Sequence, residues 1–324
     1  MGRYGLTLKG QRFLLVFLVA VLGMGCLVAG CSVRPLLHGV EITPELITPN
    51  GDGSDDVARI TYHISRQSEV SIYLEDAQGA RYYLRQNEAR SPGEDYEAWF
   101  GGTIEGRMLP EGSYRVVVEA GGPGGERVRV ERELAIRDAD AIAPELRNFA
   151  VSPTRFTPNQ DGISDRVTVS FYLSKKARVK VYLEGASGKR YPIGSEEGKE
   201  AGALDYDYDG GVERGLLPPP DGSYVVVGEA VDKVGNRALA QAPLEIAEGG
   251  IPRAEIVAGE FWPLVVPLGE TLHFTATVRN TGAIPLRTTG PAPGTGYTSR
   301  ESYDTKGHYK EPGAFRLGVD YEGN

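Results

Sequence analysis

The sequence predicts an all-β protein in which tandem antiparallel β-sandwiches follow an N-terminal export segment. Three observations lead to this fold class: alternating apolar residues, abundant turn residues and a long internal repeat. The 324 residues include 43 glycines and 21 prolines, and the apolar content of 40% is ordinary for a globular protein. After residue 30, no stretch of convincing length has the period of an amphipathic helix.

The internal repeat brings two similar segments into register after a shift of 109 positions. For example, "VSIYLEDAQGARYY" (70–83) aligns with "VKVYLEGASGKRYP" (179–192). Each copy has about the length of an immunoglobulin-like domain. We therefore expect two Ig-like modules, over residues 40–141 and 142–249.

Within each module the apolar residues recur at every second position. This period is typical of strands with one face on a core and the other in water. Short Gly, Asp and Pro clusters such as "PEGS" and "PDGS" separate the strands and favour tight turns. In the first module the alternating residues are Ile60, Tyr62, Ile64, Val70, Ile72, Leu74, Tyr114, Val116 and Val118.

The third segment, residues 250–324, differs from the repeat and follows a Gly/Pro joint, "EGGIPR". Leu272, Phe274, Ala276 and Val278 alternate in one expected strand, and "AFRLGVDY" near the end is another. About four strands over roughly 70 residues give a small core. We expect a small Ig-like or adhesion-type β domain, either reduced or truncated.

The N-terminal segment predicts export. Arg3, Lys9 and Arg12 precede an uncharged apolar run over 13–29, which is the order of regions in a secretory signal. The following "VAGC" resembles a bacterial lipobox, which implies a signal peptide over 1–30 and a lipid on Cys31. A membrane-spanning anchor or an ordinary cleaved signal is the alternative, although the run is shorter than the about 20 residues of a spanning helix.

A lipid on Cys31 implies attachment to the extracytoplasmic face of the cell membrane, with residues 31–39 as a tether. Removing residues 1–30 changes the net charge from −9 to −12 and leaves Cys31 as the single cysteine. So acidic a chain is not expected to bind nucleic acid. Its domains must be stable without disulfides.

The Asp-rich string "TPNGDGSDD" (48–56) returns as "TPNQDGISD" (157–165) and raises the possibility of calcium. An EF-hand loop does not fit, because threonines occupy the first position and neither copy has the final glutamate. A looser oxygen site remains possible, and the alternative is a turn capped by its own Asn and Asp side chains. The candidate calcium ligands are Asn50, Asp52, Asp56, Asn159, Asp161 and Asp165.

Catalytic signals are weak. The four histidines, His38, His63, His273 and His308, are scattered along the chain. There is no G-x-S-x-G elbow, P-loop, H-E-x-x-H or dinucleotide fingerprint. We therefore expect no enzymatic activity and no required cofactor, with calcium as the one possible ion.

A binding surface is the remaining candidate site. Aromatic residues crowd the last loop and strand among Gly, Ser and Thr, a composition suited to contacts with a glycan or an extracellular protein. The alternative is that these side chains cover the small core of the third segment. They are Tyr297, Tyr303, Tyr309, Phe315 and Tyr321.

Several of these motifs together resemble a known family. The Asp-rich turns, "WFGG" (99–102), "YDGG" (208–211) and "VDKVGN" (231–236) are similar to the Ig-like module of flagellar hook-capping proteins and of bacterial surface and gliding-motility proteins. Each copy departs once from the family's Trp-Asp-Gly. "GETLHFTATVRNTG" (269–282) is similar to a bacterial adhesion-related Ig-like domain. The resemblance implies spacer or adhesion modules.

Together these features predict a non-enzymatic cell-surface lipoprotein whose Ig-like spacers present a distal β domain for adhesion or envelope interaction. The alternative is a non-catalytic accessory or carbohydrate-binding component of an extracellular polysaccharide-processing or envelope complex.

Overall fold

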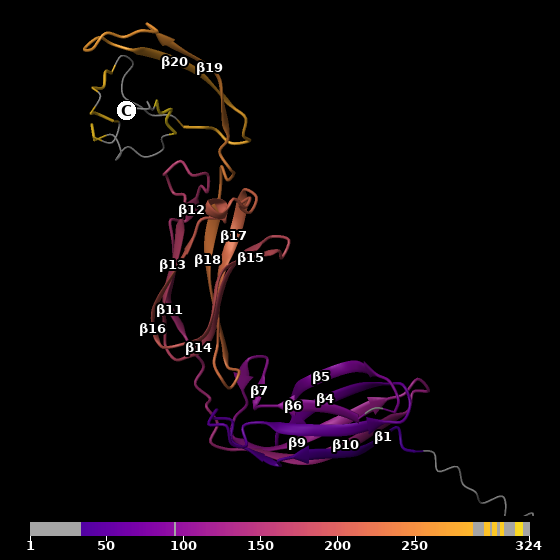
Figure 1. Ribbon diagram of the computed structural model, residues 1–324. Helices are drawn as coiled ribbons and strands as arrows, with labels where there is room; N and C mark the ends of the chain where they lie inside the picture. Colours follow the sequence, from indigo (N-terminus) through magenta and orange to yellow (C-terminus); the bar gives the residue numbers. More distant parts are fainter. Residues whose placement is uncertain are drawn as a thin grey trace, which may run out of the picture. The chain divides into compact units, whose positions relative to one another are not determined.

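The computed structural model describes residues 34–93, 95–287, 295–298, 300–302, 305–307 and 315–319. In this part of the chain the regular structure consists of strands β1 to β20 and one short 3-10 turn, η2 (Val212–Arg214) (Figure 1). The predicted all-β class is confirmed. The described residues include no helix long and apolar enough to cross a membrane. The expected signal peptide and Cys31 lie outside them.

The first sandwich has two sheets. One has the strand order β1-β3-β6 and the other the order β2-β10-β9-β4-β5. The strands are β1 (Leu37–Thr43), β2 (Leu46–Ile47), β3 (Ala58–Ile64), β4 (Ser68–Glu75), β5 (Arg81–Arg90), β6 (Asp95–Phe100), β9 (Gly112–Gly121) and β10 (Arg127–Ile136). A small separate hairpin joins β7 (Thr103–Ile104) to β8 (Arg107–Met108).

The second sandwich repeats this topology, with sheets β11-β13-β16 and β12-β18-β17-β14-β15. Even a register shift is repeated: β1 shifts between His38 and Glu41 against β3, and β11 shifts between Arg147 and Ala150 against β13. The strands are β11 (Leu146–Ser152), β12 (Arg155–Phe156), β13 (Val167–Leu173), β14 (Ala177–Gly185), β15 (Arg190–Lys199), β16 (Gly202–Tyr208), β17 (Gly222–Val231) and β18 (Arg237–Ile246). Pairing is antiparallel except for β12, which runs parallel to β18.

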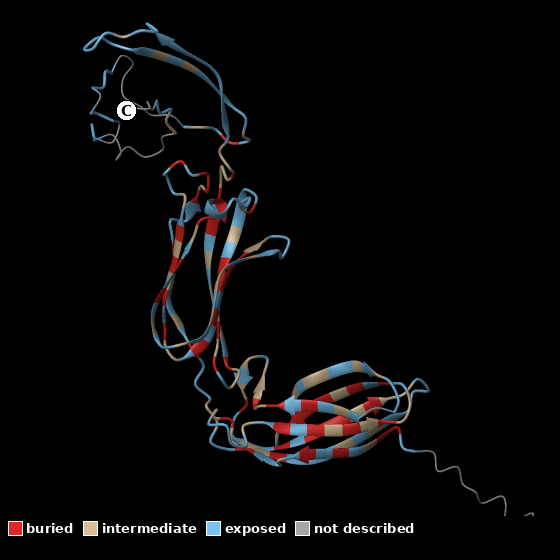
Figure 2. Ribbon diagram, in the orientation of Figure 1, coloured by how far each residue is buried: buried red, intermediate tan, exposed pale blue. Residues whose placement is uncertain are grey.

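Both sandwiches have well-filled cores. All nine alternating residues singled out in the first module are buried, as the period of two predicts. In the second sandwich Val167, Val169 and Phe171 of β13 pack with Val179, Val181 and Leu183 of β14 in one cluster. Figure 2 shows this alternation of buried and exposed positions along the strands.

The third region is different, because the sheet in its described part has no buried side chain. β19 (Ala254–Trp262) pairs with β20 (His273–Asn280), and no residue of either strand is buried. Among the described residues after 250, the buried apolar side chain is Ile284, which is 6% exposed. The expected last strand is not found over residues 315–319, which are described but belong to no strand.

The chain divides into two compact units that do not coincide with the sequence repeat. Unit 1 comprises Met1–Leu46, Ala58–Phe100 and Gly112–Ala135. Unit 2 comprises Ile47–Val57, Gly101–Glu111 and Ile136–Asn324. Two loops that belong to the first copy of the repeat, 47–57 and 101–111, thus group with the second sandwich.

Candidate functional sites

The first Asp-rich turn leads into β3 and is held by its own side chains. Asp56 accepts hydrogen bonds from the backbone N–H of Gly51 at 2.6 Å and of Gly53 at 2.8 Å. Asn50 Oδ1 accepts the N–H of Asp52, and Asp52 Oδ1 accepts that of Ser54, both at 2.8 Å. Gly51 and Gly53 have φ angles of 77° and 95°, in the left-handed region that favours glycine.

The second turn, leading into β13, repeats these bonds. Asp165 accepts the N–H groups of Asn159, Gln160 and Gly162 at 3.0, 2.7 and 2.6 Å. Asn159 accepts the N–H of Asp161 at 3.0 Å, and Asp161 accepts that of Ile163 at 2.9 Å. Asn159 and Asp161 are buried, whereas their counterparts in the first turn are not.

The six predicted calcium ligands therefore come together, three in each turn, and most of their bonds are those of a capped turn. Each carboxylate or amide oxygen that binds a backbone N–H satisfies a donor that would otherwise lack a partner. Among the described residues, no group of three or more His, Cys, Asp or Glu side chains is placed to hold a metal ion. Calcium at these turns stays a prediction.

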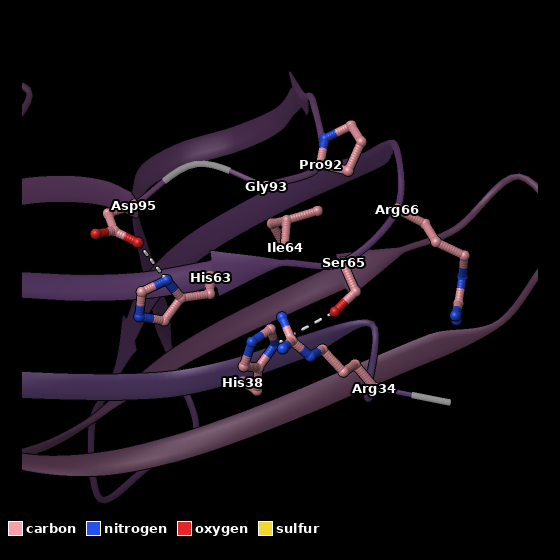
Figure 3. Close-up of a pocket in the computed structure, with 9 residues that line it drawn as sticks. All are labelled: Arg34, His38, His63, Ile64, Ser65, Arg66, Pro92, Gly93 and Asp95. Atoms are coloured by element: carbon pink, nitrogen blue, oxygen red, sulfur yellow. Dashed lines mark hydrogen bonds and ion pairs between the residues drawn. The ribbon is translucent and has the colours of Figure 1, made fainter. Parts of the chain in front are cut away.

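A pocket of about 440 Å³ in unit 1 is lined by two histidines that are distant in sequence (Figure 3). His38 of β1 lies opposite His63 of β3, and their rings stack with centroids 5.3 Å apart. Asp95 Oδ1 lies 2.6 Å from Nδ1 of His63. The expectation that the histidines are scattered is therefore wrong for His38 and His63. The pair depends on the β1–β3 register, which the sequence does not indicate.

The same pocket holds Ser65, but its geometry does not make this serine a nucleophile. The hydroxyl donates to the carbonyl of Pro35 at 2.8 Å and is 3.5 Å from Nδ1 of His38. Asp95 supports His63, the other histidine. Serine, histidine and carboxylate therefore form no relay of the kind that activates a hydroxyl.

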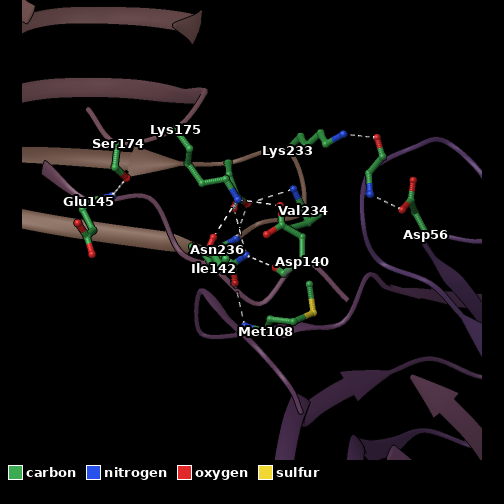
Figure 4. Close-up of polar contacts among 12 residues, drawn as sticks. Asp56, Met108, Asp140, Ile142, Glu145, Ser174, Lys175, Lys233, Val234 and Asn236 are labelled. Carbon is green, nitrogen blue, oxygen red and sulfur yellow. Dashed lines mark hydrogen bonds and ion pairs between the residues drawn. The ribbon is translucent and has the colours of Figure 1, made fainter. Parts of the chain in front are cut away.

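A polar network in unit 2 surrounds Lys175 (Figure 4). Lys175 Nζ donates to Asp140 at 2.7 Å, to Asp232 at 2.9 Å and to the carbonyl of Ile142 at 2.8 Å. Burial works against the charged amine, but the hydrogen bonds to the two carboxylates outweigh it and raise the pKa of Lys175. These groups are all partnered, so the network is structural.

The "YDGG" motif forms another capped turn. Asp209 accepts the N–H groups of Gly211 and Glu213 at 2.8 and 2.9 Å, at the start of η2. Burial opposes ionisation, yet these hydrogen bonds lower the pKa of Asp209. In the first copy the corresponding residue is Phe100, which is buried, while Trp99 beside it is 59% exposed.

The predicted aromatic surface lies mostly outside the described residues. Tyr303, Tyr309 and Tyr321 fall there, whereas Tyr297 is 43% exposed, with Lys306 Nζ 5.2 Å from its ring centroid. The described part of the third region carries another aromatic group, which we did not predict. On its hairpin Phe261 packs against Phe274 and Trp262 stacks on His273, with ring centroids 4.8 and 4.9 Å apart.

No family model matches the sequence, and no curated protein does so either. The expected resemblance to hook-capping and gliding-motility modules therefore stays a prediction.

The solved structures to which the chain is similar include three from adhesins. The first is a tetra-tandem repeat in the extending region of a large adhesion protein, with 13% identity, 76% of this chain and 64% of that chain covered, and a TM-score of 0.25. The second is a Ca2+-stabilized adhesin of an ice-binding Antarctic bacterium, with 14% identity, coverage of 69% and 50%, and a TM-score of 0.23. The third is a 1.5-MDa bacterial ice-binding adhesin, with 12% identity, coverage of 64% and 63%, and a TM-score of 0.23.

The chain spans less than two thirds of the length of each of these three structures. At these identities and TM-scores, the likenesses carry no argument about function.

Proposed function

We propose that this chain is an exported, non-enzymatic surface protein, anchored by a lipid on Cys31, whose two sandwiches are spacers for an adhesive third region. The observation that carries the proposal is the contrast between two filled cores and one bare hairpin. A spacer needs a stable core, and a binding region needs accessible apolar side chains.

The sandwiches fit the spacer role through their packing. Tyr62, Phe100 and Phe156 are among the fully buried side chains, and they lie between sheets of matching topology. The ionisable groups described in the turns and in the Lys175 network have backbone or side-chain partners. Such groups stabilise a fold and are not themselves prepared for acid–base chemistry.

The exposed side chains of the β19–β20 hairpin fit a region that binds a partner. Large apolar side chains that a folded core would bury are exposed along β19 and in the loop after it. An exposed apolar patch of this kind is typical of an interaction surface. The residues are Ile256, Val257, Phe261, Trp262, Leu264, Val265 and Leu268.

Adhesion of intact cells tests this role. Cells with the wild-type chain, a deletion strain and a Trp262→Ala variant are compared for binding to a surface matrix. The chain offers a matched control, because its other tryptophan, Trp99, is similarly exposed but lies on β6. We expect deletion to abolish binding, Trp262→Ala to weaken it roughly tenfold and Trp99→Ala to leave it unchanged. Equal adhesion of the deletion strain and the wild type would disprove the proposal.

A second candidate function is carbohydrate binding within an envelope or polysaccharide-processing complex. The observation that favours it is the flat stack of Trp262 on His273, with an interplanar angle of 12°. Exposed aromatic faces of this kind suit the apolar face of a sugar ring. A glycan array probed with the full mature chain and with Trp262→Ala separates the two functions: glycan binding that the variant loses favours this candidate.

The lipid anchor has its own test. Cys31→Ser removes the thiol that the lipid would modify, so we expect the protein to leave the membrane fraction for the soluble fraction or to remain uncleaved. An unchanged membrane fraction with normal cleavage would exclude the lipid at this residue.

A further inference from the structure

We propose that each Asp-rich turn is a docking seat for the next domain along the chain, which places one cationic side chain on it. Lys233 of the second sandwich occupies the first seat, and Arg287 of the third region occupies the second. Both seats lie in unit 2. The inference does not depend on the proposed adhesive role.

The first seat offers a backbone oxygen to the cation. While Asp56 holds the N–H of Gly51, the carbonyl of Gly51 accepts a hydrogen bond from Lys233 Nζ at 2.6 Å (Figure 4). The stem of Lys233 lies so close to Gly51 that an added Cβ would overlap its carbon atoms. Glycine at position 51 thus allows the positive φ angle of the turn and also leaves room for the side chain of Lys233.

The turn that carries Lys233 makes further contacts with the neighbouring loop, 101–111. Asn236 Oδ1 accepts the N–H of Met108 at 3.0 Å, and the N–H of Arg237 donates to the carbonyl of Gly106 at 2.8 Å. Asn236 is itself fixed by the hydrogen bonds that its amide donates to Asp140 and Asp232. The "VDKVGN" motif is therefore a docking element. Its position is fixed by Asp140 and Asp232, which bind both Asn236 and Lys175.

The second seat offers a carboxylate. Nε of Arg287 lies 3.2 Å from Oδ2 of Asp161, whose side chain is only 2% exposed. A second nitrogen of the same guanidinium donates to Glu248 at 3.1 Å. Nearby, Ile284 is so close to Gly250 that an added Cβ there would be 2.6 Å from its Cγ2. Arg287 thus ties the third region to the second turn, while Ile284 packs on Gly250 at the beginning of the same region.

The two seats are built on the same turn, although they offer the cation different acceptors and are occupied by different domains. Asp140 N–H donates to Pro49 in the first turn, and Gly250 N–H donates to Pro158 in the second, each at 3.0 Å. The cations come from a sandwich turn in one case and from the segment after a bare hairpin in the other. The feature common to both joints is the turn, whose several carboxylates give it a negative potential that favours a nearby lysine or arginine.

Limited proteolysis of the full mature chain with trypsin tests both seats in one assay, because a susceptible bond lies at each joint. The bond after Arg107 contains the N–H of Met108 that Asn236 binds, and the bond after Arg253 leads into β19. Under native conditions the rate of cleavage follows the population of locally opened chain. The products are identified by mass spectrometry.

We expect Lys233→Met to accelerate cleavage after Arg107 about threefold, since this contact is exposed. Arg287→Gln should accelerate cleavage after Arg253 about tenfold, because it leaves the buried Asp161 without its cation. Lys180→Met and Arg279→Gln, at exposed positions of β14 and β20, serve as controls. Lys233→Arg keeps the cation and should cleave at the wild-type rate.

The two seats are tested independently, each by the rate of cleavage at its own trypsin site. Cleavage of Lys233→Met no faster than that of Lys180→Met would overturn the first seat. Cleavage of Arg287→Gln no faster than that of Arg279→Gln would overturn the second. Thermal unfolding of each variant confirms that the sandwiches remain folded, so that a faster cut reports the joint.

Discussion

Asp56 and Asp165, 109 positions apart, have the same role: each carboxylate closes its own turn by accepting backbone N–H groups. Asp56 accepts two of them and Asp165 accepts three. A hydrogen bond to a charged acceptor is stronger than a neutral one. The repeated string is therefore first a folding element at the entry to β3 and to β13.

Removing either carboxylate should destabilise its sandwich. We expect Asp165→Ala to lower the free energy of unfolding by about 2 kcal/mol and Asp56→Ala by somewhat less, because several donors lose their partner at once. Urea denaturation measures the change. Asp205→Ala, on an exposed position of β16, is the control and should have no effect. Equal stability of all three variants would contradict this role.

The same bonds lead to a prediction about calcium. Since the Asp and Asn oxygens already bind backbone N–H groups, we expect millimolar calcium and a chelator to give the same unfolding midpoint within about a degree. Differential scanning calorimetry measures it. A rise of several degrees that Asp52→Ala or Asp161→Ala abolishes would instead establish the predicted oxygen sites.

Alkaline pH should weaken the second sandwich. Burial raises the pKa of Tyr208 from its ordinary value of 10.0 to about 12, and the pKa of Lys175 is also raised. The folded state keeps these protons after the unfolded chain has lost them, so stability is full below pH 10 and falls as pH rises from about 10 to about 12. Tyr208→Phe should make that fall shallower in urea titrations. An identical fall in the variant would contradict the assignment.

Acid should act through Asp209 in the opposite direction. The pKa of Asp209 is lowered in the folded state, so its contribution is present above the ordinary value of 3.8 and is lost as pH falls through the folded value. Asp209→Asn should therefore be less stable than the wild type at pH 7, and the difference should shrink towards pH 2. A constant difference across this range would show that ionisation is not involved.

The sandwiches and turns were predictable because they depend on local pattern. Ile60, Tyr62 and Ile64 alternate in the sequence and are buried in β3 as expected. The last expected strand is not formed over 315–319, since the described part of the third region offers no core against which an alternating segment could pack. The exposure of Phe261 and Trp262 could not be predicted, since aromatic residues in a strand are typical of a buried face.

By itself, the sequence determined the all-β class, the repeat and the position of each Asp-rich turn, because period, length and turn chemistry are local properties of the chain. Only the tertiary structure decided that His38 faces His63, that no residue of β19 or β20 is buried, and that Lys233 and Arg287 reach the turns. These are non-local contacts, set by strand register and by packing between distant segments. A single sequence does not specify which partners meet there.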